Sequence, residues 1–224
     1  AERLGVERMP ELERYMLHLM AKLDEDVRAA YAAFDFKLVW RKVFDFCALD
    51  LSAFYLDIRK DSLYCDHPDT DRRRAARTVM EIAFDRLTAW LAPICVFTME
   101  EAWLNRNGEG AQSVHLRQFP ETPARWRDEA LAERWETLRD IRRVVTGAIE
   151  IERREKRIGA SLEASPTLYL EGDALFAAVN GRDLAELFIT SDVTVERGEG
   201  PATAFRGEDT PVVAVVASKS AFKK

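Results

Sequence analysis

The sequence predicts a mainly α-helical fold, an antiparallel helical bundle followed by a small α+β appendage. Up to about residue 158, apolar residues recur every three or four positions, which is the spacing of a helix face that packs on a core. Gly159 then supplies a residue that commonly ends a helix. From Ser161 onward the apolar runs are short and interrupted by glycines, as between strands and turns. We therefore expect a helical domain over residues 1–160 and an α+β domain over residues 161–224.

Local signals divide the helical part into segments. Ser52 is placed to cap a helix, residues 67–69 form a turn, Pro93 interrupts a helix, and Thr98 opens another as the first residue of a capping box. The expected helices cover residues 10–34, 35–49, 52–65, 71–92 and 127–158, with a shorter one beginning at Thr98.

The other segments are expected to be irregular or extended. Residues 105–126 are rich in Gly, Pro, Asn and Gln, and we interpret them as a long connection across the bundle with an extended piece at residues 113–119. In the appendage the pattern predicts strands at 167–170, 193–196 and 212–217, and short helices at 173–178 and 183–188.

Composition limits the class of protein. With 47% hydrophobic and 32% charged residues, the chain of 224 residues is typical of a soluble globular protein with an ion-rich surface. No run of about eighteen apolar residues could span a membrane, and the N-terminus lacks a secretory pattern. Neither the three cysteines nor the three histidines have the spacing of metal ligands, so we expect a cytoplasmic protein without a metal site. The sequence begins without Met, and we expect a fragment of a longer chain.

Five segments carry a resemblance to a known family. They read, in order along the chain, DLSAFYLDIRKDSLYCD (50–66), LAPICVFTMEEAW (91–103), SVHLRQFP (113–120), EKRIGASLEA (155–164) and LAELFITSDV (184–193). The chain resembles the isoleucyl-tRNA synthetases, which are class I aminoacyl-tRNA synthetases, over most of residues 10–195. The valine, leucine and methionine enzymes share the helical domain, but IRKDSLYCD and KRIGASLEA point to the isoleucine enzyme.

This resemblance implies a function for the helical domain. It would be an anticodon-binding domain that recognises the anticodon arm of an isoleucine-accepting tRNA, with no DNA or membrane partner. The parent reaction would be ATP-dependent joining of isoleucine to tRNA, with Mg²⁺, in a catalytic domain of the same polypeptide. No catalytic arrangement is expected in this chain, and no cofactor either.

The departures from the family pattern support a fragment. The HIGH-type signature that holds ATP phosphates is not in the sequence, nor is the editing domain. Residues 217–220 only faintly echo the KMSKS loop and follow the helical domain, whereas that loop precedes it in the family. Many bacterial members carry a cysteine-rich zinc module beyond the point that corresponds to Lys224, so we expect this chain to be cut before a possible module of that kind.

Two stretches of positive charge are the candidate RNA-binding surfaces. Residues 59–77 contain six Lys or Arg against four Asp, and residues 139–157 contain seven against four acidic residues, in a chain whose net charge is −6. Arg142 and Arg153 are eleven residues apart, about 16 Å along one helix face, a spacing that suits successive phosphates. We predict phosphate contacts from Arg142, Arg153 and Arg157. The full candidate set is Arg59, Lys60, Arg72, Arg73, Arg74, Arg77, Arg142, Arg143, Arg153, Arg154, Lys156 and Arg157, with Trp126 as a stacking platform for bases.

Ordinary structural roles remain open for these residues. Glu150–Arg154 and Glu152–Lys156 have the four-residue spacing of pairs that support an exposed helix. Basic residues at a helix start, as at residues 72–74, oppose the helix dipole and therefore favour an external use. The alternative function is a helical protein-interaction scaffold without RNA binding, whose marker would be an exposed apolar patch.

Overall fold

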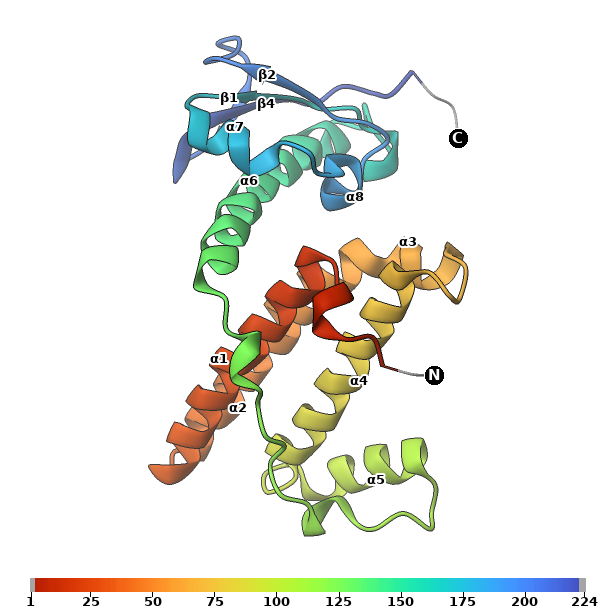
Figure 1. Cartoon of the computed structure of the whole chain (residues 1–224). Helices are drawn as coiled ribbons and strands as arrows, with labels where there is room; N and C mark the ends of the chain where they lie inside the picture. Colours follow the sequence, from red (N-terminus) through yellow and green to blue (C-terminus); the bar gives the residue numbers. More distant parts are fainter. Residues whose placement is uncertain (1–2, 222–224) are drawn as a thin grey trace. The chain divides into compact units, whose positions relative to one another are not determined.

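The computed structural model describes residues 3–221, which pack as two compact units, Ala1–Leu131 and Ala132–Lys224 (Figure 1). We call them the N-terminal and the C-terminal unit and describe each by itself. Helices dominate the first and a four-stranded sheet is confined to the second, so the mainly helical fold with a small α+β appendage is confirmed. None of the helices in the described part of the chain is both long and apolar enough to cross a membrane.

The N-terminal unit is built from five α-helices and short 3₁₀ turns. The helices are α1 (Glu11–Ala32), α2 (Phe36–Asp45), α3 (Asp57–Cys65), α4 (Asp71–Leu91) and α5 (Val96–Asn107), and α6 (Glu129–Arg154) begins at the end of this unit. The 3₁₀ turns are Val6–Arg8, Val114–Leu116 and Ala124–Trp126. The periodicity placed α1 and α4 to within two residues, because each is long and has a continuous apolar face.

Helices α1 and α2 form a tight hairpin. Phe34 adopts a left-handed conformation with φ of 57°, and the Asp35 carboxylate accepts a hydrogen bond of 2.9 Å from the Leu38 N–H at the start of α2. The inner face of α1 is the centre of the core, where Met16, Leu17 and Met20 are fully buried. This hairpin fixes one side of the bundle.

The expected break between residues 49 and 52 is wrong. A π-helical stretch, Phe46–Leu56, joins α2 to α3 without interruption, and Ser52 lies inside it instead of capping a new helix. Each π turn accommodates an additional residue relative to an α turn. Within this stretch Phe54 and Tyr55 are buried, while Ser52 is exposed to solvent.

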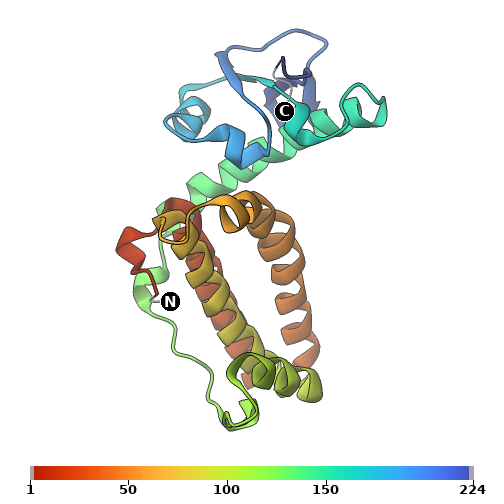
Figure 2. The same ribbon diagram turned by 90° about the vertical axis from the view of Figure 1, so that its right-hand side faces the viewer.

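The connection from α5 to α6 returns along α1, as the green segment of Figure 2 shows. Arg28 of α1 donates to the Pro120 carbonyl at 2.8 Å, and His18, more than two turns earlier, accepts from the Asp128 N–H at 3.0 Å. Arg86 of α4 donates to the Glu121 carbonyl at 2.9 Å. The prediction of a long crossing connection is therefore confirmed, although its middle piece is a 3₁₀ turn instead of an extended segment.

The C-terminal unit contains a mixed sheet in the order β2-β1-β4-β3. Its strands are β1 (Thr167–Leu170), β2 (Thr194–Arg197), β3 (Phe205–Gly207) and β4 (Thr210–Val216). Strand β1 pairs in parallel with β2 and antiparallel with β4, which also pairs with β3. Two short helices, α7 (Asp173–Val179) and α8 (Leu184–Phe188), form the crossover from β1 to β2. The three expected strands are confirmed, and the three-residue β3 is additional.

Helix α6 and the sheet together form the hydrophobic core of the C-terminal unit. Leu138, Ile141 and Ile149 are fully buried within the C-terminal unit, as is Leu168 of the sheet. A Cβ atom added at Gly147 would lie 2.9 Å from the Phe205 ring, so the missing side chain lets the sheet approach the helix closely. The helix ends at Arg154, four residues before the predicted end.

Candidate nucleic-acid interface

At the start of α4, the first two arginines of the basic cluster bind the turn that precedes the helix. Arg72 forms hydrogen bonds of 2.7 and 2.8 Å with the Asp66 carboxylate, and Arg73 donates to the Asp66 carbonyl. The hydrogen bond from Arg72 lowers the pKa of Asp66, which keeps this carboxylate ionised. Arg72 and Arg73 therefore hold the turn between α3 and α4.

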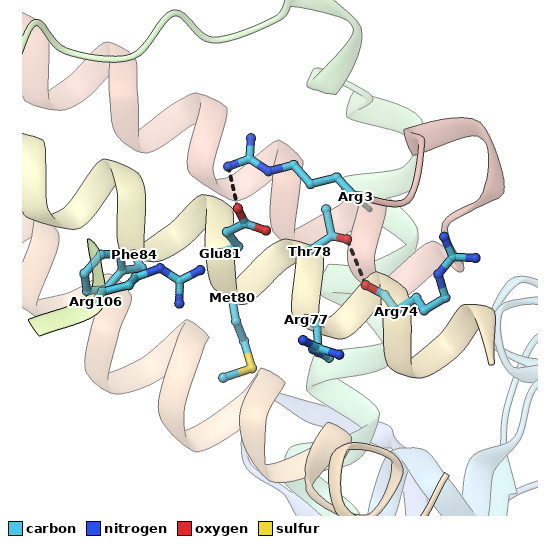
Figure 3. Close-up of a pocket in the computed structure, with 8 residues that line it drawn as sticks. All are labelled: Arg3, Arg74, Arg77, Thr78, Met80, Glu81, Phe84 and Arg106. Carbon is cyan, nitrogen blue, oxygen red and sulfur yellow. Dashed lines mark hydrogen bonds and ion pairs between the residues drawn. The ribbon is translucent and has the colours of Figure 1, made fainter. Parts of the chain in front are cut away.

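A groove lies beside the following turns of α4, as Figure 3 shows. The groove has a volume of about 400 Å³. Its walls come from the N-terminal segment, from α4 and from α5, and the lining residues are Arg3, Arg74, Arg77, Thr78, Met80, Glu81, Phe84 and Arg106. Four guanidinium groups and a single carboxylate thus line one concave surface.

Each charged side chain of the groove is held in a different way. Arg3 lies 3.0 Å from Glu81, and this hydrogen bond lowers the pKa of the Glu81 carboxyl. The Arg106 guanidinium lies 5.1 Å from the centroid of the Phe84 ring, where a cation–π contact orients it. Arg74 lies 4.0 Å from Asp71, at the outer limit of an ion pair. No described residue forms a hydrogen bond or an ion pair with the exposed Arg77 side chain.

The groove can bind an anion. One acidic group cannot neutralise four guanidinium groups, and that acid is already engaged by Arg3. Guanidinium groups present their N–H donors in a fork that matches the oxygens of a phosphate. Arg77 and Arg106 are the side chains with the fewest competing partners, and they are the best placed to contact a phosphate.

Two candidates from the sequence are buried in the N-terminal unit. Arg59 is 4% exposed, and its guanidinium forms hydrogen bonds of 2.6 and 2.9 Å with both carboxylate oxygens of Glu13. Trp126 is 6% exposed, and Arg86 covers its ring at 4.4 Å from the centroid. A buried guanidinium and a covered indole are not accessible to a nucleotide in this structure, so neither residue enters the proposed set of RNA contacts. Lys60, next to Arg59, is exposed on α3 and remains a candidate.

In the C-terminal unit, the cations of α6 are mostly engaged within the unit. Arg142 is half-buried and donates to the Leu187 carbonyl at 2.9 Å, which ties α6 to α8. Arg143 pairs with Asp140 at 3.1 Å, and Arg153 pairs with Glu150. The predicted row of phosphate contacts along one face of α6 therefore loses its first residue, because Arg142 has a structural partner.

The end of α6 differs from the expected helix. Lys156 has a left-handed backbone with φ of 59°, which turns the chain so that Arg157 reaches back to the Glu152 carboxylate at 2.6 Å. The expected pairs Glu150–Arg154 and Glu152–Lys156 are wrong, because Arg153 and Arg157 take these two carboxylates. In the described part of the chain, the exposed Arg154 and Lys156 side chains have no ion-pair partner.

Arg3 and Arg106 of the groove were not among the residues chosen from the sequence. Each stands alone in the sequence, outside the two stretches of concentrated positive charge. Only the packing of the N-terminal segment and α5 against α4 brings them beside Arg74 and Arg77. A search for charges that are close together in the sequence cannot detect charges that only the folding brings together.

Comparison with known proteins identifies the family. The family model for the anticodon-binding domain of tRNA ligase matches residues 13–168. The chain is 53% identical over 219 residues to the isoleucine–tRNA ligase of Mesorhizobium japonicum, and 52% identical over 214 residues to that of Agrobacterium fabrum. These matches cover 98% and 96% of this chain, but the chain spans only 22% of the length of either relative. The chain belongs to the anticodon-binding domain family of tRNA ligases.

Proposed function

We propose that this chain recognises the anticodon arm of an isoleucine-accepting tRNA as one part of an isoleucine–tRNA ligase. The observation that carries the proposal is the similarity to isoleucine–tRNA ligases over nearly the whole chain, together with the anticodon-binding family match. The parent reaction would be ATP-dependent aminoacylation of that tRNA. It would occur in a catalytic domain of the same polypeptide, outside the matched region.

The groove on α4 supplies the chemistry of binding in the N-terminal unit. Phosphates of the anticodon stem would displace bound counterions as they meet Arg77 and Arg106, and the released ions favour association. Arg3 and Arg74 would add to the positive potential of the groove. Phosphate contacts position an RNA without reading its sequence, so the anticodon bases would be read elsewhere on the interface.

The set of proposed RNA contacts therefore changes from the one drawn from the sequence. Arg59 and Trp126 leave it because they are buried, and Arg72, Arg73 and Arg142 support local structure. The retained and added residues are Arg3, Lys60, Arg74, Arg77, Arg106, Arg143, Arg153, Arg154, Lys156 and Arg157.

The cofactors of the proposed ligase would lie outside this chain. ATP with Mg²⁺ would bind in the catalytic domain, and a zinc ion would belong to a module beyond Lys224. Within residues 3–221, no group of three His, Cys, Asp or Glu side chains is arranged to hold a metal ion. A cytoplasmic location is part of the same proposal.

The test is a binding experiment with three RNAs. The purified chain is titrated into fluorescently labelled isoleucine tRNA, the same tRNA with a substituted anticodon, and an unrelated tRNA, at low and at moderate salt. We expect the tightest binding to the natural isoleucine tRNA, weaker binding to the other two, and a marked loss of affinity with salt. Equal binding to all three RNAs would reject anticodon recognition, and no binding at low salt would reject this interface.

A further inference from the structure

Helix α2 carries large apolar side chains on a solvent-exposed face. Phe36, Trp40 and Phe44 follow one another at four-residue intervals, over about 12 Å of helix axis, and they are 49%, 46% and 57% exposed. The Trp40 and Phe44 rings stack at 6.2 Å between centroids, and Phe34 meets Phe36 edge to face. Leu49 is 60% exposed in the π-helical stretch that follows. We call these five residues the α2 ridge.

The α2 ridge lies beside the part of the helix that is already packed. Val39 and Val43 are buried in the N-terminal unit, at 0% and 2% exposure. At 100° per residue, the buried and the exposed apolar side chains together cover about 140° of the helix circumference. A helix that packs on a single side carries an apolar stripe of roughly 100° or more, and polar residues elsewhere. Part of the apolar stripe of α2 is covered within the N-terminal unit, and the part formed by Phe36, Trp40 and Phe44 is left open to a second neighbour.

The surroundings of the α2 ridge favour a protein as the second neighbour. Trp40 offers the one side-chain N–H among the five residues, so the ridge has little capacity to read polar base edges. Its rings also contact one another in two pairs, Phe34 with Phe36 and Trp40 with Phe44, which occupies ring faces and edges that bases would need for stacking. Lys37 and Arg41 border it, exposed and without an ion-pair partner among the described residues. An apolar centre with a charged rim is the usual form of a protein interface.

We propose that the α2 ridge is the docking surface for an amphipathic helix of the remaining ligase polypeptide, one with an apolar face and acidic residues opposite Lys37 and Arg41. This inference rests on the proposed function, because it requires the chain to be part of a longer ligase. Its relatives carry almost four fifths of their length outside the region matched by this chain, which is an ample source for such a helix. Contiguous exposed apolar patches of this kind commonly mark interaction surfaces.

Radical footprinting can test the docking. The rate of hydroxyl-radical oxidation of Phe36, Trp40 and Phe44 is measured by mass spectrometry, with an added peptide as the dose standard. The isolated chain is compared with a chimera in which this chain replaces the matching region of the Mesorhizobium japonicum ligase, both without tRNA. We expect at least a fivefold lower oxidation rate in the chimera. Equal rates in the two proteins would overturn the proposal.

Further arms of the same experiment separate the other occupants. Protection that appears only after tRNA is added would assign the α2 ridge to RNA and overturn the docking. Protection of the isolated chain that grows with protein concentration would assign it to a second copy. If tRNA binding fails while the ridge is protected in the chimera, the docking stands and anticodon recognition fails, so the two proposals are judged separately.

A pair of variants gives an independent readout. Trp40→Lys with Phe44→Lys should lower the melting temperature of the chimera by several degrees and leave that of the isolated chain within about two degrees. Val39→Lys, one position away but buried, should lower it strongly in both proteins. An unchanged melting temperature of the chimera with the double substitution would contradict the docking of a helix on α2.

Discussion

Glu13 of α1 and Arg59 of α3 form an ion pair in which both side chains are almost completely shielded from water. Arg59 Nε and Nη2 lie 2.6 and 2.9 Å from the two carboxylate oxygens of Glu13, and the Tyr55 hydroxyl donates to the same carboxylate at 3.1 Å. Burial and the neighbouring carboxylate raise the pKa of Tyr55 well above its usual range, so this hydroxyl remains a donor. Arg59 thus neutralises the charge of the Glu13 carboxylate inside the bundle.

Replacing Arg59 should therefore destabilise the fold instead of weakening RNA binding directly. We expect Arg59→Met to lower the free energy of unfolding by about 3–5 kcal/mol, because it leaves the Glu13 carboxylate buried without a cationic partner. Urea denaturation of the isolated chain measures the change. The neighbouring Lys60→Met, at an exposed position, should stay within about 0.5 kcal/mol of the unmodified chain. Similar stabilities of the two variants would contradict the structural role of Arg59.

Arg77 should contribute to tRNA binding without contributing to stability. We expect Arg77→Ala to weaken tRNA binding and to reduce the slope of log affinity against log salt by about one unit, because one phosphate contact is lost. Titrations at four or more salt concentrations measure the slope. Lys22→Ala, which removes an exposed cation of α1 outside the groove, is the matched control and should leave the slope unchanged. An equal reduction in both variants would mean that only the net charge matters.

The stability of the chain should depend on pH through His18. Burial lowers the pKa of His18 below 6.5, its ordinary value, and its Nδ1 accepts the Asp128 N–H while the ring is neutral. The unfolded chain binds a proton more readily than the folded chain, so the free energy of unfolding should decrease as pH falls below 6.5 and level off below the folded pKa. Thermal melts from pH 8 to pH 5 measure this dependence. His18→Asn, which keeps an acceptor but cannot titrate there, should show a smaller decrease, and an identical decrease would exclude His18 as the cause.

Gly147 should tolerate alanine only if the Phe205 ring is removed. Alanine is favoured over glycine by about 1 kcal/mol inside a helix, but the new methyl group would lie 2.9 Å from Phe205. We expect Gly147→Ala to lower the free energy of unfolding by about 1 kcal/mol, since overpacking exceeds the gain in helix propensity. In a Phe205→Ala background the same change should instead be stabilising. A double-mutant cycle measures this coupling, and additive effects would contradict the close packing of α6 and β3.

The sequence predicted the helices and strands whose apolar pattern is long enough to be unambiguous. Helix α1 and strand β4 belong to this group. The break expected at Ser52 did not form because a side chain capable of capping does not oblige the chain to end a helix there, and the π turns keep the backbone hydrogen-bonded. Strand β3 has only three residues, too few for a period to be visible.

The candidate site was less predictable because it depends on contacts between distant segments. Arg59 has the sequence context of an exposed charge, and its partner Glu13 lies 46 residues away. Arg106 acquires its place from the packing of α5 on Phe84. The domain boundary expected at residue 160 also stays a prediction. The compact packing divides the chain at Leu131, whereas the family match continues to residue 168.

At residues 120 and 121, the connection between α5 and α6 is held through its main chain. Arg28 and Arg86 donate to the carbonyl oxygens of Pro120 and Glu121, and every amino acid carries such an oxygen. These two contacts consequently do not depend on which side chains stand at residues 120 and 121. Substitutions at residues 120 and 121 can therefore leave both of these anchors in place, provided that the two arginines are retained.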